Sequence, residues 1–524
     1  MERYKHIPKL LFICLIISSD LFLFSLCIES DDFKIQEITI EQIHNAFAQN
    51  KLTSRQLVDF YLRQIETLNP ELCSVSEVNP AAQDDADRQW KVDNHDLQLP
   101  GSLHGIPVLL KDSIPSDAGV AEKIRKAGAV ILGKVSPKEH SVSDSQEPPN
   151  DWCTKNHQSV NPYVEIADPC GSKSGSAISV AANMVAVSLA TEVDGSISCS
   201  ADRNSVVGIK PTIGLTSRAG IGALPTRLGT VGPIGRTVSD AVALLDAIVG
   251  YDPEDPEATG EAVRFIPKGG YKQFLNKDGL NGKRMAIIST PYFESFLRDS
   301  ITASTFEKHM DTLRLRGATI VDNLPTAYTD LIFDPYKSSE AREALTRFNA
   351  TLSKYLDDVN NSPLPPRPEN DSFPEMAEGG RDATSLMKFR ELGEDLNKLQ
   401  SSVTNVSGSA FEKLIQEYDL DAVVTLGQDA FKVLSITGNP GITVPAGYEA
   451  DGMPFGICFS GVRGSEPALI QVAYGFEQAT NIRKPPLFSK TFRIEDHLHI
   501  SRMKSSNSSS FNAFPFPSGL TGDF

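Results

Sequence analysis

The first strongly patterned stretch of the chain is residues 41–69, where apolar residues recur at intervals of three and four. That spacing places them on one face of a helix, so we expect a helix over 41–69 with a structural role. Within it, Thr53 and Gln56 have the spacing of a capping box, in which each side chain accepts a hydrogen bond from the other residue's backbone N–H.

A strand, a helix and a second strand follow. Residues 106–110 form a short apolar run, typical of a buried strand, and Lys111 stands at its end. Residues 122–127 favour a helix that ends at Gly128, and residues 129–132 favour the next strand. Strands that alternate with helices in this way predict an α/β fold whose sheet is covered on both faces.

Two loops of small residues flank another helix and strand in the middle of the chain. We expect a loop at 171–176, a helix over 177–183, a strand over 184–190 and a second tight loop at 191–196. A helix of about eight residues runs ~12 Å outward, and a strand of about five residues returns ~16 Å. Both loops should therefore lie at one end of the sheet, where α/β proteins place ligands.

The second half of the chain is patterned more sparsely. Thr237 and Asp240 have the spacing of another capping box, which opens an apolar helix through Val249. We expect the Pro-rich segment 360–373 to be a linker or exposed loop, and the Ser-rich tail 501–524 to be disordered. Short apolar runs predict strands at 285–288, 423–426, 442–444 and 455–459.

The N-terminus has the pattern of a secretory signal peptide over residues 1–27. A basic start with Arg3 and Lys5 precedes an apolar stretch, and small residues end it. Asp20 interrupts the apolar run, and a carboxylate is costly in lipid, so we expect no stable membrane span. The pattern predicts the secretory pathway, with the mature chain extracellular or in an organelle lumen. A buried N-terminal helix is the alternative.

Glycosylation signals and cysteines bear on the same prediction. Removal of residues 1–27 would leave five cysteines, an odd number, so at least one would not pair within the chain. Their spacing shows no metal-binding pattern and leaves the disulfides undecided. Sequons that predict a glycoprotein stand at Asn349, Asn360, Asn370, Asn405 and Asn507.

Composition narrows the function classes. The 524 residues are 40% apolar and 22% charged, as in a soluble globular protein long enough to bury a sizeable core. The formal net charge of −17 argues against a nucleic-acid partner, because phosphate binding needs clustered Lys and Arg. Nothing in the composition decides between a monomer and a homodimer.

The serine loops carry the candidate chemistry, although each loop alone is a common turn with helix caps. Five motifs in one order, extending with their surroundings over about 38–492, resemble the amidase signature family, in a branch frequent in plants. The resemblance implies one amidase domain over 31–500, with a mixed β-sheet sandwiched between α-helices. The motifs are GIPVLLKD at 105–112, GSKSGSA at 171–177, DGSI at 194–197, VGIKPT at 207–212 and TVGP at 230–233.

By that resemblance, the chain is an amidohydrolase with a Ser-Ser-Lys triad that passes through an acyl-enzyme. Ser196 matches the nucleophile, Ser172 the bridging serine held by a cis peptide, and Lys111 the general base. A serine hydroxyl attacks well only when a base takes its proton, and a lysine can do so only when it is uncharged. Ser172 would pass the proton from Ser196 to Lys111 and return it to the leaving amine.

The resemblance also implies an oxyanion hole made by the backbone N–H groups of Val193, Asp194, Gly195 and Ser196. Such donors stabilise the charge of the tetrahedral intermediate. The substrate would be a small-molecule amide, with no metal and no cofactor. His104, His140 and His157 show no metal-ligand spacing and are not expected to act in catalysis.

Three departures from the family pattern keep two alternatives open. Lys173 stands where a small residue is usual, Ser198 stands where many members have Arg, and the segment after Ile114 is shorter than usual. The short segment could open the acyl pocket or displace Lys111, which motivates a catalytically impaired protein with the amidase fold. The second alternative is the ammonia-supplying glutaminase subunit of a tRNA amidotransferase, against which the signal peptide and the acidic charge balance speak.

Overall fold

The computed structural model describes residues 34–92, 103–135, 159–170, 174–192, 195–221, 229–288, 300–321, 324 and 410–488. Within these ranges, residues from 37 to 488 belong to one compact unit that spans 37–492. The signal peptide predicted at 1–27, the five sequons, the linker at 360–373 and the tail at 501–524 lie outside the described residues and stay predictions.

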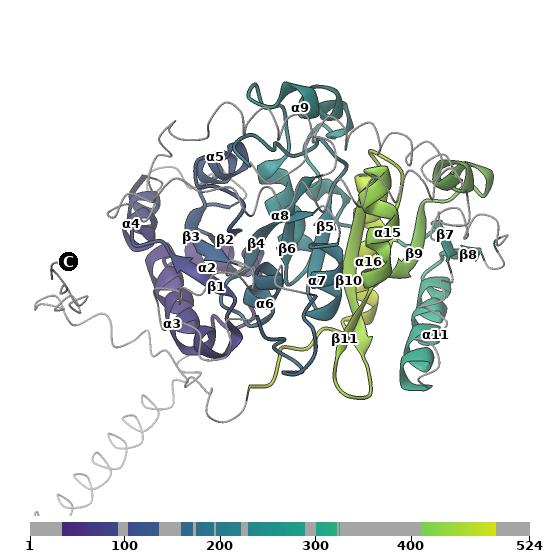
Figure 1. Cartoon of the computed structure of the whole chain (residues 1–524), viewed down its shortest axis with the longest axis horizontal. Coiled ribbons are helices and arrows are strands. Elements are labelled where there is room, and N and C mark those ends of the chain that lie inside the picture. The colour runs from purple at the N-terminus through teal and green to yellow at the C-terminus, as the bar shows by residue number, and fades with distance from the viewer. Residues whose placement is uncertain are drawn as a thin grey trace, which may run out of the picture. The chain divides into compact units, whose positions relative to one another are not determined.

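One mixed sheet runs through the described part of this unit (Figure 1). Its strands lie in the order β1-β3-β2-β4-β6-β5-β10-β11-β9-β7-β8. Pairing is parallel between β3, β2 and β4 and between β8, β7 and β9, and antiparallel elsewhere. The strands are β1 Val75–Val78, β2 Pro107–Lys111, β3 Val130–Val135, β4 Val187–Glu192, β5 Val207–Lys210, β6 Thr230–Gly235, β7 Arg284–Ile287, β8 Thr319–Val321, β9 Ala422–Leu426, β10 Gly441–Tyr448 and β11 Pro454–Ser460.

Helices cover both faces of the sheet, which confirms the predicted fold class. On one face α6, α7 and α15 pack against the strands, and on the other face α8, α11 and α16 do so. The helices are α2 Ile40–Ala48, α3 Ser54–Leu72, α4 Ala82–Val92, α5 Gly119–Lys126, α6 Gly175–Ala181, α7 Ser198–Arg203, α8 Val238–Ile248, α9 Pro256–Ala262, α11 Ser300–Leu315, α15 Gly427–Thr437 and α16 Glu466–Thr480, with 3₁₀ turns at Val263–Phe265 and Lys272–Phe274.

The two faces of the sheet differ in chemistry because neighbouring residues of a strand point to opposite sides. In β5, Val207 and Ile209 join the apolar core beneath α8 and α16. Gly208 instead lies against α7, where a Cβ atom would come within 2.8 Å of the Ala201 Cβ. Lys210, two residues after Gly208 in the same strand, points to the same face as Gly208. The large apolar core thus lies on the α8 side, and small and polar residues line the α7 side.

Several predicted elements are confirmed with shifted ends, and one prediction was wrong. The single helix predicted over 41–69 is two helices, α2 and α3, because Asn50 adopts a left-handed φ of 53° and breaks the chain between them. The capping box of Thr53 and Gln56 is present and begins α3, with both hydrogen bonds in place. The strands and helices predicted at 106–110, 122–127, 129–132, 177–183, 285–288, 423–426, 442–444 and 455–459 are found as β2, α5, β3, α6, β7, β9, β10 and β11.

The second predicted capping box is only half formed. Thr237 accepts a hydrogen bond from the Asp240 N–H at the start of α8. The Asp240 carboxylate accepts instead from the Ile40 N–H at 2.8 Å, so it joins α8 to α2.

The strand predicted over 184–190 is also displaced. It is β4, which begins at Val187 and runs to Glu192, because Asn183 turns the chain with a φ of 56°. The loop predicted from residue 191 therefore begins after Glu192, and this shift places a carboxylate at the end of a buried strand.

The cysteines that the sequence left undecided include one pair. Cys170 and Cys199 form a disulfide with a Cα–Cα distance of 5.9 Å. Cys73 and Cys458 are buried, and Cys153 lies outside the described residues. Across the described ranges, no helix combines the length and the apolar character that crossing a bilayer requires.

We expect Gly208→Ala to lower the free energy of unfolding by about 1–3 kcal/mol, the usual cost of overpacking. The new methyl would meet the Ile197 Cγ2 at 2.9 Å as well as Ala201, and so push α7 off the sheet. Urea denaturation measures the change. The matched control is Gly260→Ala on the exposed side of α9, where a helical alanine should stabilise by up to about 1 kcal/mol. Equal stability of the two variants would show that α7 is not tightly seated.

Candidate functional site

The candidate site lies where β2 and β4, parallel neighbours in the sheet, both end. Leu109 pairs with Ser188 in this ladder, so their side chains share a face. The Ser188 hydroxyl donates to the Ser176 carbonyl of α6 at 3.0 Å, which identifies that face as the α6 side. Lys111, two residues beyond Leu109, points to the same face. Its side chain is buried, with 9% of the residue exposed.

The predicted nucleophile, Ser196, lies four residues after the end of β4 and is 5% exposed. Gly195 before it has a φ of 99°, a left-handed conformation that favours glycine. The Cys199 N–H donates to the Gly195 carbonyl at 2.9 Å and closes the loop into α7. The structure thus brings Lys111 and the loop of Ser196 to adjacent strand ends.

The Glu192 side chain holds this loop in place through hydrogen bonds. Its fully buried carboxylate accepts hydrogen bonds from the Ile197 N–H at 2.5 Å, the Ser198 N–H at 3.1 Å and the Ser198 hydroxyl at 3.1 Å. Because these two backbone N–H groups are occupied, they cannot serve a substrate. Of the predicted oxyanion donors, Gly195 and Ser196 are described, whereas Val193 and Asp194 lie outside the described residues.

Lys210 on β5 carries a charge opposite to that of the Glu192 carboxylate. Burial raises the pKa of the Glu192 carboxyl, and Lys210 and the hydrogen bonds from Ile197 and Ser198 lower it. The net pKa is raised, while the three donors that converge on the carboxylate favour its ionised form. Lys210 donates to the Asn439 carbonyl at 2.8 Å, and burial lowers its pKa to about 8. Lys210 thus supplies a positive charge to Glu192, the carboxylate that binds Ser198, and Ser198 is the position where many family members have Arg.

The segment that carries Ser172 is described only at its two flanks, because residues 171–173, including Lys173, lie outside the described residues. On one flank, the Pro169 carbonyl accepts hydrogen bonds from the Ser174 hydroxyl at 2.5 Å and from the Asn204 side chain at 3.1 Å. On the other flank, the Ser174 hydroxyl lies 3.3 Å from the Ser200 hydroxyl of α7. Both flanks therefore lie against α7 and the residue that follows it, and the role and the cis peptide of Ser172 stay predictions.

A second lysine at this edge, Lys134, was not singled out in the sequence. It lies on β3, paired with Leu110, and its ammonium donates to the Ile114 carbonyl. Burial lowers the pKa of Lys134 to about 8. The only sequence signal was a lysine just beyond a predicted buried strand.

The short segment after Ile114 does not remove Lys111 from its strand. Lys111 is the last residue of β2, and the chain turns from there directly into α5. Within the turn, the Ser113 hydroxyl lies 3.4 Å from the Thr191 hydroxyl of β4. The turn is therefore fastened to the neighbouring strand.

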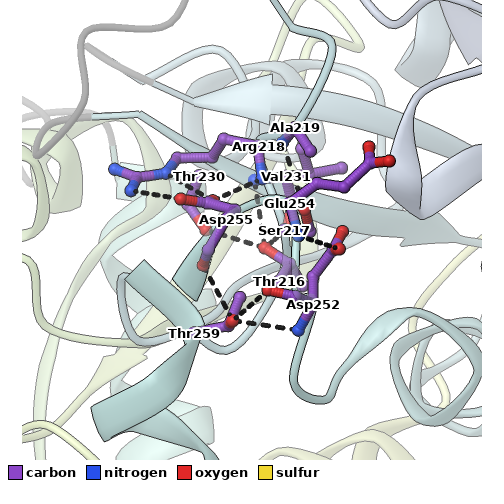
Figure 2. A network of polar contacts seen from close by, with 10 residues as sticks. All are labelled: Thr216, Ser217, Arg218, Ala219, Thr230, Val231, Asp252, Glu254, Asp255 and Thr259. Atoms are coloured by element: carbon purple, nitrogen blue, oxygen red, sulfur yellow. Dashed lines mark hydrogen bonds and ion pairs between the residues drawn. The ribbon is translucent and has the colours of Figure 1, made fainter. Parts of the chain in front are cut away.

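β6 is the neighbour of β4 on the side away from β2. At the start of β6, a polar network holds residues 216–219 in place (Figure 2). The Thr216 hydroxyl donates to the Val231 carbonyl at 2.9 Å. Arg218 forms a two-pronged ion pair with Asp255, at 3.2 and 3.3 Å. Next to Arg218, the Ala219 carbonyl accepts from the Gly119 N–H at 3.4 Å. The network thus links the start of β6 to α5, the helix that follows the turn after Lys111.

Asp202 joins the far end of α7 to the sheet. Its carboxylate accepts from the Gly456 N–H of β11 at 2.7 Å. Burial raises the pKa of Asp202 to about 7, while Arg203 and the Gly456 hydrogen bond lower it and Glu449 and Asp429 raise it further. In the described ranges, no group of three or more His, Cys, Asp and Glu side chains is arranged to hold a metal ion.

Comparison with known proteins gives a consistent result. A family model described as Amidase matches residues 114–470. The chain is 46% identical over 490 residues to a probable amidase of Arabidopsis thaliana, covering 88% of this chain and 93% of that one. It is 29% identical over 504 residues to a glutamyl-tRNA(Gln) amidotransferase chain of Microcystis aeruginosa, covering 85% and 98%.

Solved structures show the same likeness. The native peptide amidase from Stenotrophomonas maltophilia superposes with a TM-score of 0.65 at 30% identity, covering 86% of this chain and 99% of that one. An amidase family protein from Bacillus anthracis superposes with a TM-score of 0.67 at 26% identity, covering 87% and 93%.

We expect Glu192→Gln to lower the free energy of unfolding by about 3 kcal/mol, because an amide NH₂ would face backbone donors and Lys210 would lose its counter-charge. Chemical denaturation at neutral pH measures the loss. Glu261→Gln is the control: Glu261 pairs with Arg264 on the surface, so its change should stay within about 0.5 kcal/mol. A variant as stable as the wild type would mean that Glu192 is not ionised in the folded protein.

We expect the contribution of Asp202 to stability to fall as the pH rises from about 4 to 7. In this window the folded protein keeps a proton on Asp202, with its pKa of about 7, whereas the unfolded chain has released it. Asp202→Asn removes this titration and keeps the acceptor oxygen, so the variant should gain stability relative to wild type by at most about 1.4 kcal/mol per pH unit.

The measurement is the urea midpoint of both proteins at several pH values between 4 and 8. Asp311→Asn, which alters an exposed ion pair on α11, should run parallel to the wild type. A constant difference between Asp202→Asn and wild type would show that Asp202 is ionised throughout.

Proposed function

This chain belongs to the amidase signature family, and we propose that it hydrolyses carboxamides through an acyl-enzyme, with Ser196 as nucleophile, Ser172 as proton bridge and Lys111 as general base. The observation that carries the proposal is the meeting of two strand ends, β2 with buried Lys111 and β4 with the tight loop of Ser196. Ser172 enters the proposal by its place in the family motif. Both described flanks of its segment lie against α7.

The first step is removal of the proton from the Ser196 hydroxyl. A lysine takes up a proton only in its uncharged form, and burial disfavours the ammonium. Lys111 lies in a strand whose residues are all buried, which supports this role. The proton would pass through the Ser172 hydroxyl to the Lys111 amine while the Ser196 oxygen attacks the amide carbon. The same path returns a proton to the leaving amine, without which the C–N bond breaks poorly.

Charge on the carbonyl oxygen would be stabilised by backbone N–H groups of the loop. Glu192 takes the donors on the far side of Ser196, at Ile197 and Ser198. The oxyanion site is therefore assigned to the near side, with the N–H groups of Gly195 and Ser196 and, by the family motif, those of Val193 and Asp194. One donor of this kind is worth about 3–4 kcal/mol in the transition state.

The substrate class and the location are part of the proposal. The likeness to a peptide amidase at 30% identity favours a peptide amide as the first substrate to test. The Cys170–Cys199 disulfide supports the secretory pathway, since disulfides persist in oxidising compartments. The similarity to a glutamyl-tRNA(Gln) amidotransferase chain keeps glutamine as a second substrate, in which case the protein would release ammonia for a partner.

We expect Ser196→Ala to lose at least about 1,000-fold in amide turnover, the usual effect of removing a nucleophile. Lys111→Met should lose at least about 100-fold, because the base supplies the proton transfer. A panel of a peptide C-terminal amide, a fatty-acid amide, an aryl amide and glutamine measures turnover, and a fluorophosphonate probe reports labelling of Ser196.

Lys134→Met is the matched control, because Lys134 is a second partly buried lysine near the end of β3, the strand next to that of Lys111. It should keep most of the turnover and the probe labelling. Loss of turnover in Lys134→Met, together with full turnover in Lys111→Met, would assign the role of general base to Lys134 instead of Lys111. A folded wild type that neither turns over the panel nor reacts with the probe would instead support the catalytically impaired alternative. Turnover of glutamine alone would favour the amidotransferase role.

A further inference from the structure

Lys210, the last residue of β5, is a buried cation that the proposed triad does not use, and only 1% of it is exposed. Because β4 and β5 both pair antiparallel with β6, they run in the same direction. Lys210 and Glu192 therefore end their strands at one edge of the sheet, where Ser196 follows Glu192. A lysine is almost never buried this deeply without partners, and the partners of Lys210 belong to three loops at this edge.

The first partner is Glu192, in the loop of the proposed nucleophile. Burial raises the pKa of the Glu192 carboxyl, and the charge of Lys210 is the strongest effect that opposes this rise. The carboxylate accepts hydrogen bonds from the Ile197 N–H at 2.5 Å and the Ser198 N–H at 3.1 Å. Hydrogen bonds to an ionised acceptor are stronger than neutral ones. The cation therefore strengthens the contacts that hold the residues directly after Ser196.

The second partner is Glu466, the first residue of α16. Its side chain is fully buried and accepts a hydrogen bond from the Thr212 N–H at 2.7 Å, in the loop that follows β5. Burial raises the pKa of the Glu466 carboxyl, and the charge of Lys210 lowers it. One cation thus acts on two buried carboxylates, and each carboxylate binds the backbone of a loop at this edge.

The third partner is the backbone of Asn439, two residues before β10. The Lys210 ammonium donates to the Asn439 carbonyl at 2.8 Å, and β10 begins at Gly441, which pairs with Lys210. This loop is also joined to the loop after β5, because the Ile213 N–H donates to the Gly438 carbonyl at 3.2 Å. Lys210 therefore interacts with the loops after β4 and β5 and with the loop before β10.

The charges around Lys210 explain why a cation is needed here. Burial lowers the pKa of Lys210 to about 8, and the carboxylates of Glu192 and Glu466 oppose this shift. Arg463 lowers the pKa further and Cys458 raises it. With a pKa of about 8, Lys210 is mostly protonated at neutral pH. Removing one member of a buried group of charges leaves the others uncompensated and weakens the arrangement that they hold.

We propose that Lys210 is a positioning residue of the catalytic site, whose ammonium favours the ionised Glu192 carboxylate that holds the loop of Ser196. The proposal rests on the proposed function. A displacement of about 1 Å at a reacting group can cost roughly 100-fold in rate. Because Lys210 acts through Glu192 and not on the substrate, its loss should lower kcat and leave KM nearly unchanged.

The first test compares full-length Lys210→Met with the wild type. Methionine is unbranched and flexible, so it fills the space of the lysine stem without its charge. The measurements are kcat and KM on the amide that the wild type turns over fastest, the rate at which a fluorophosphonate labels Ser196, and circular dichroism as a check of folding. We expect kcat and the labelling rate to fall at least about tenfold, a loss within the range of small misplacements.

Lys283→Met is the matched control. Lys283 forms an ion pair with Asp421 at 3.0 Å, and Asp421 also accepts a hydrogen bond from the Arg284 N–H at 2.8 Å. This repeats the combination of a lysine, a carboxylate and a bound backbone N–H at the start of β7, four strands away from β5 in the sheet. Its loss should leave kcat and the labelling rate at the wild-type values.

A double-mutant cycle tests whether Lys210 acts through Glu192. If it does, adding Lys210→Met to Glu192→Gln should lower kcat little further, because the ionised carboxylate is already gone. The losses of the two single variants would then fail to multiply in the double variant. The double variant removes both charges of this pair together, so it is compared directly with the wild type if either single variant does not fold. A lowered kcat with nearly unchanged KM is then the expected result.

Three results would overturn the proposal: a wild-type kcat in folded Lys210→Met, a raised KM at unchanged kcat, or losses that multiply in the double variant. A wild-type kcat in the double variant would overturn it as well. Failure of the proposed function gives a different result. In that case the wild type itself shows neither turnover nor labelling of Ser196, and the positioning role falls with the triad.

Discussion

The interaction on which the candidate site depends is the buried carboxylate of Glu192 with the backbone N–H groups of Ile197 and Ser198. It converts the end of a strand into the start of a helix within a few residues, and it leaves Ser196 at the turn between them. Without such an acceptor, the first N–H groups of α7 would be buried without partners. The same bonds decide which backbone donors remain for a substrate, so one carboxylate determines both the shape of the loop and the side from which an oxyanion can be bound.

A buried carboxylate is costly unless hydrogen bonds and an opposite charge stabilise it, and the sheet supplies that charge through Lys210. Lys210 lies on the same face as Glu192, among small residues such as Gly208 that allow α7 to approach. The alternation of β5 separates this polar face from the apolar core under α8 and α16. The division explains how one sheet can support both a large hydrophobic core and buried charge: each strand contributes alternate residues to each. The proposed chemistry lies on the face with less apolar packing.

The site is assembled from segments far apart in the sequence, and different kinds of contact hold its parts. Lys111, the proposed base, belongs to a strand, and Ser196, the proposed nucleophile, belongs to a loop held by backbone hydrogen bonds. Pro169 and Cys170, which precede the proposed bridging serine Ser172, are attached to the residue after α7 by a hydrogen bond and to α7 by the Cys170–Cys199 disulfide. A catalytic set needs a precision of about 0.5 Å, and here the disulfide adds a covalent link to the hydrogen bonds of Pro169 and Ser174.

The sequence by itself determined the class of fold, most of the strands, and the positions of Lys111 and Ser196 at strand ends, because periodicity and small-residue loops are local properties. It also located the capping box at Thr53. It could not determine that 41–69 is two helices, since a single left-handed residue breaks a pattern that stays helical on both sides. Only the tertiary structure decided that Glu192 turns inward to bind the loop, that Asp240 binds α2 rather than its own helix end, that Lys134 shares the edge with Lys111, and that Cys170 pairs with Cys199. These are contacts between segments that meet only when the sheet forms, and no pattern along the chain encodes which distant donor a buried group will find.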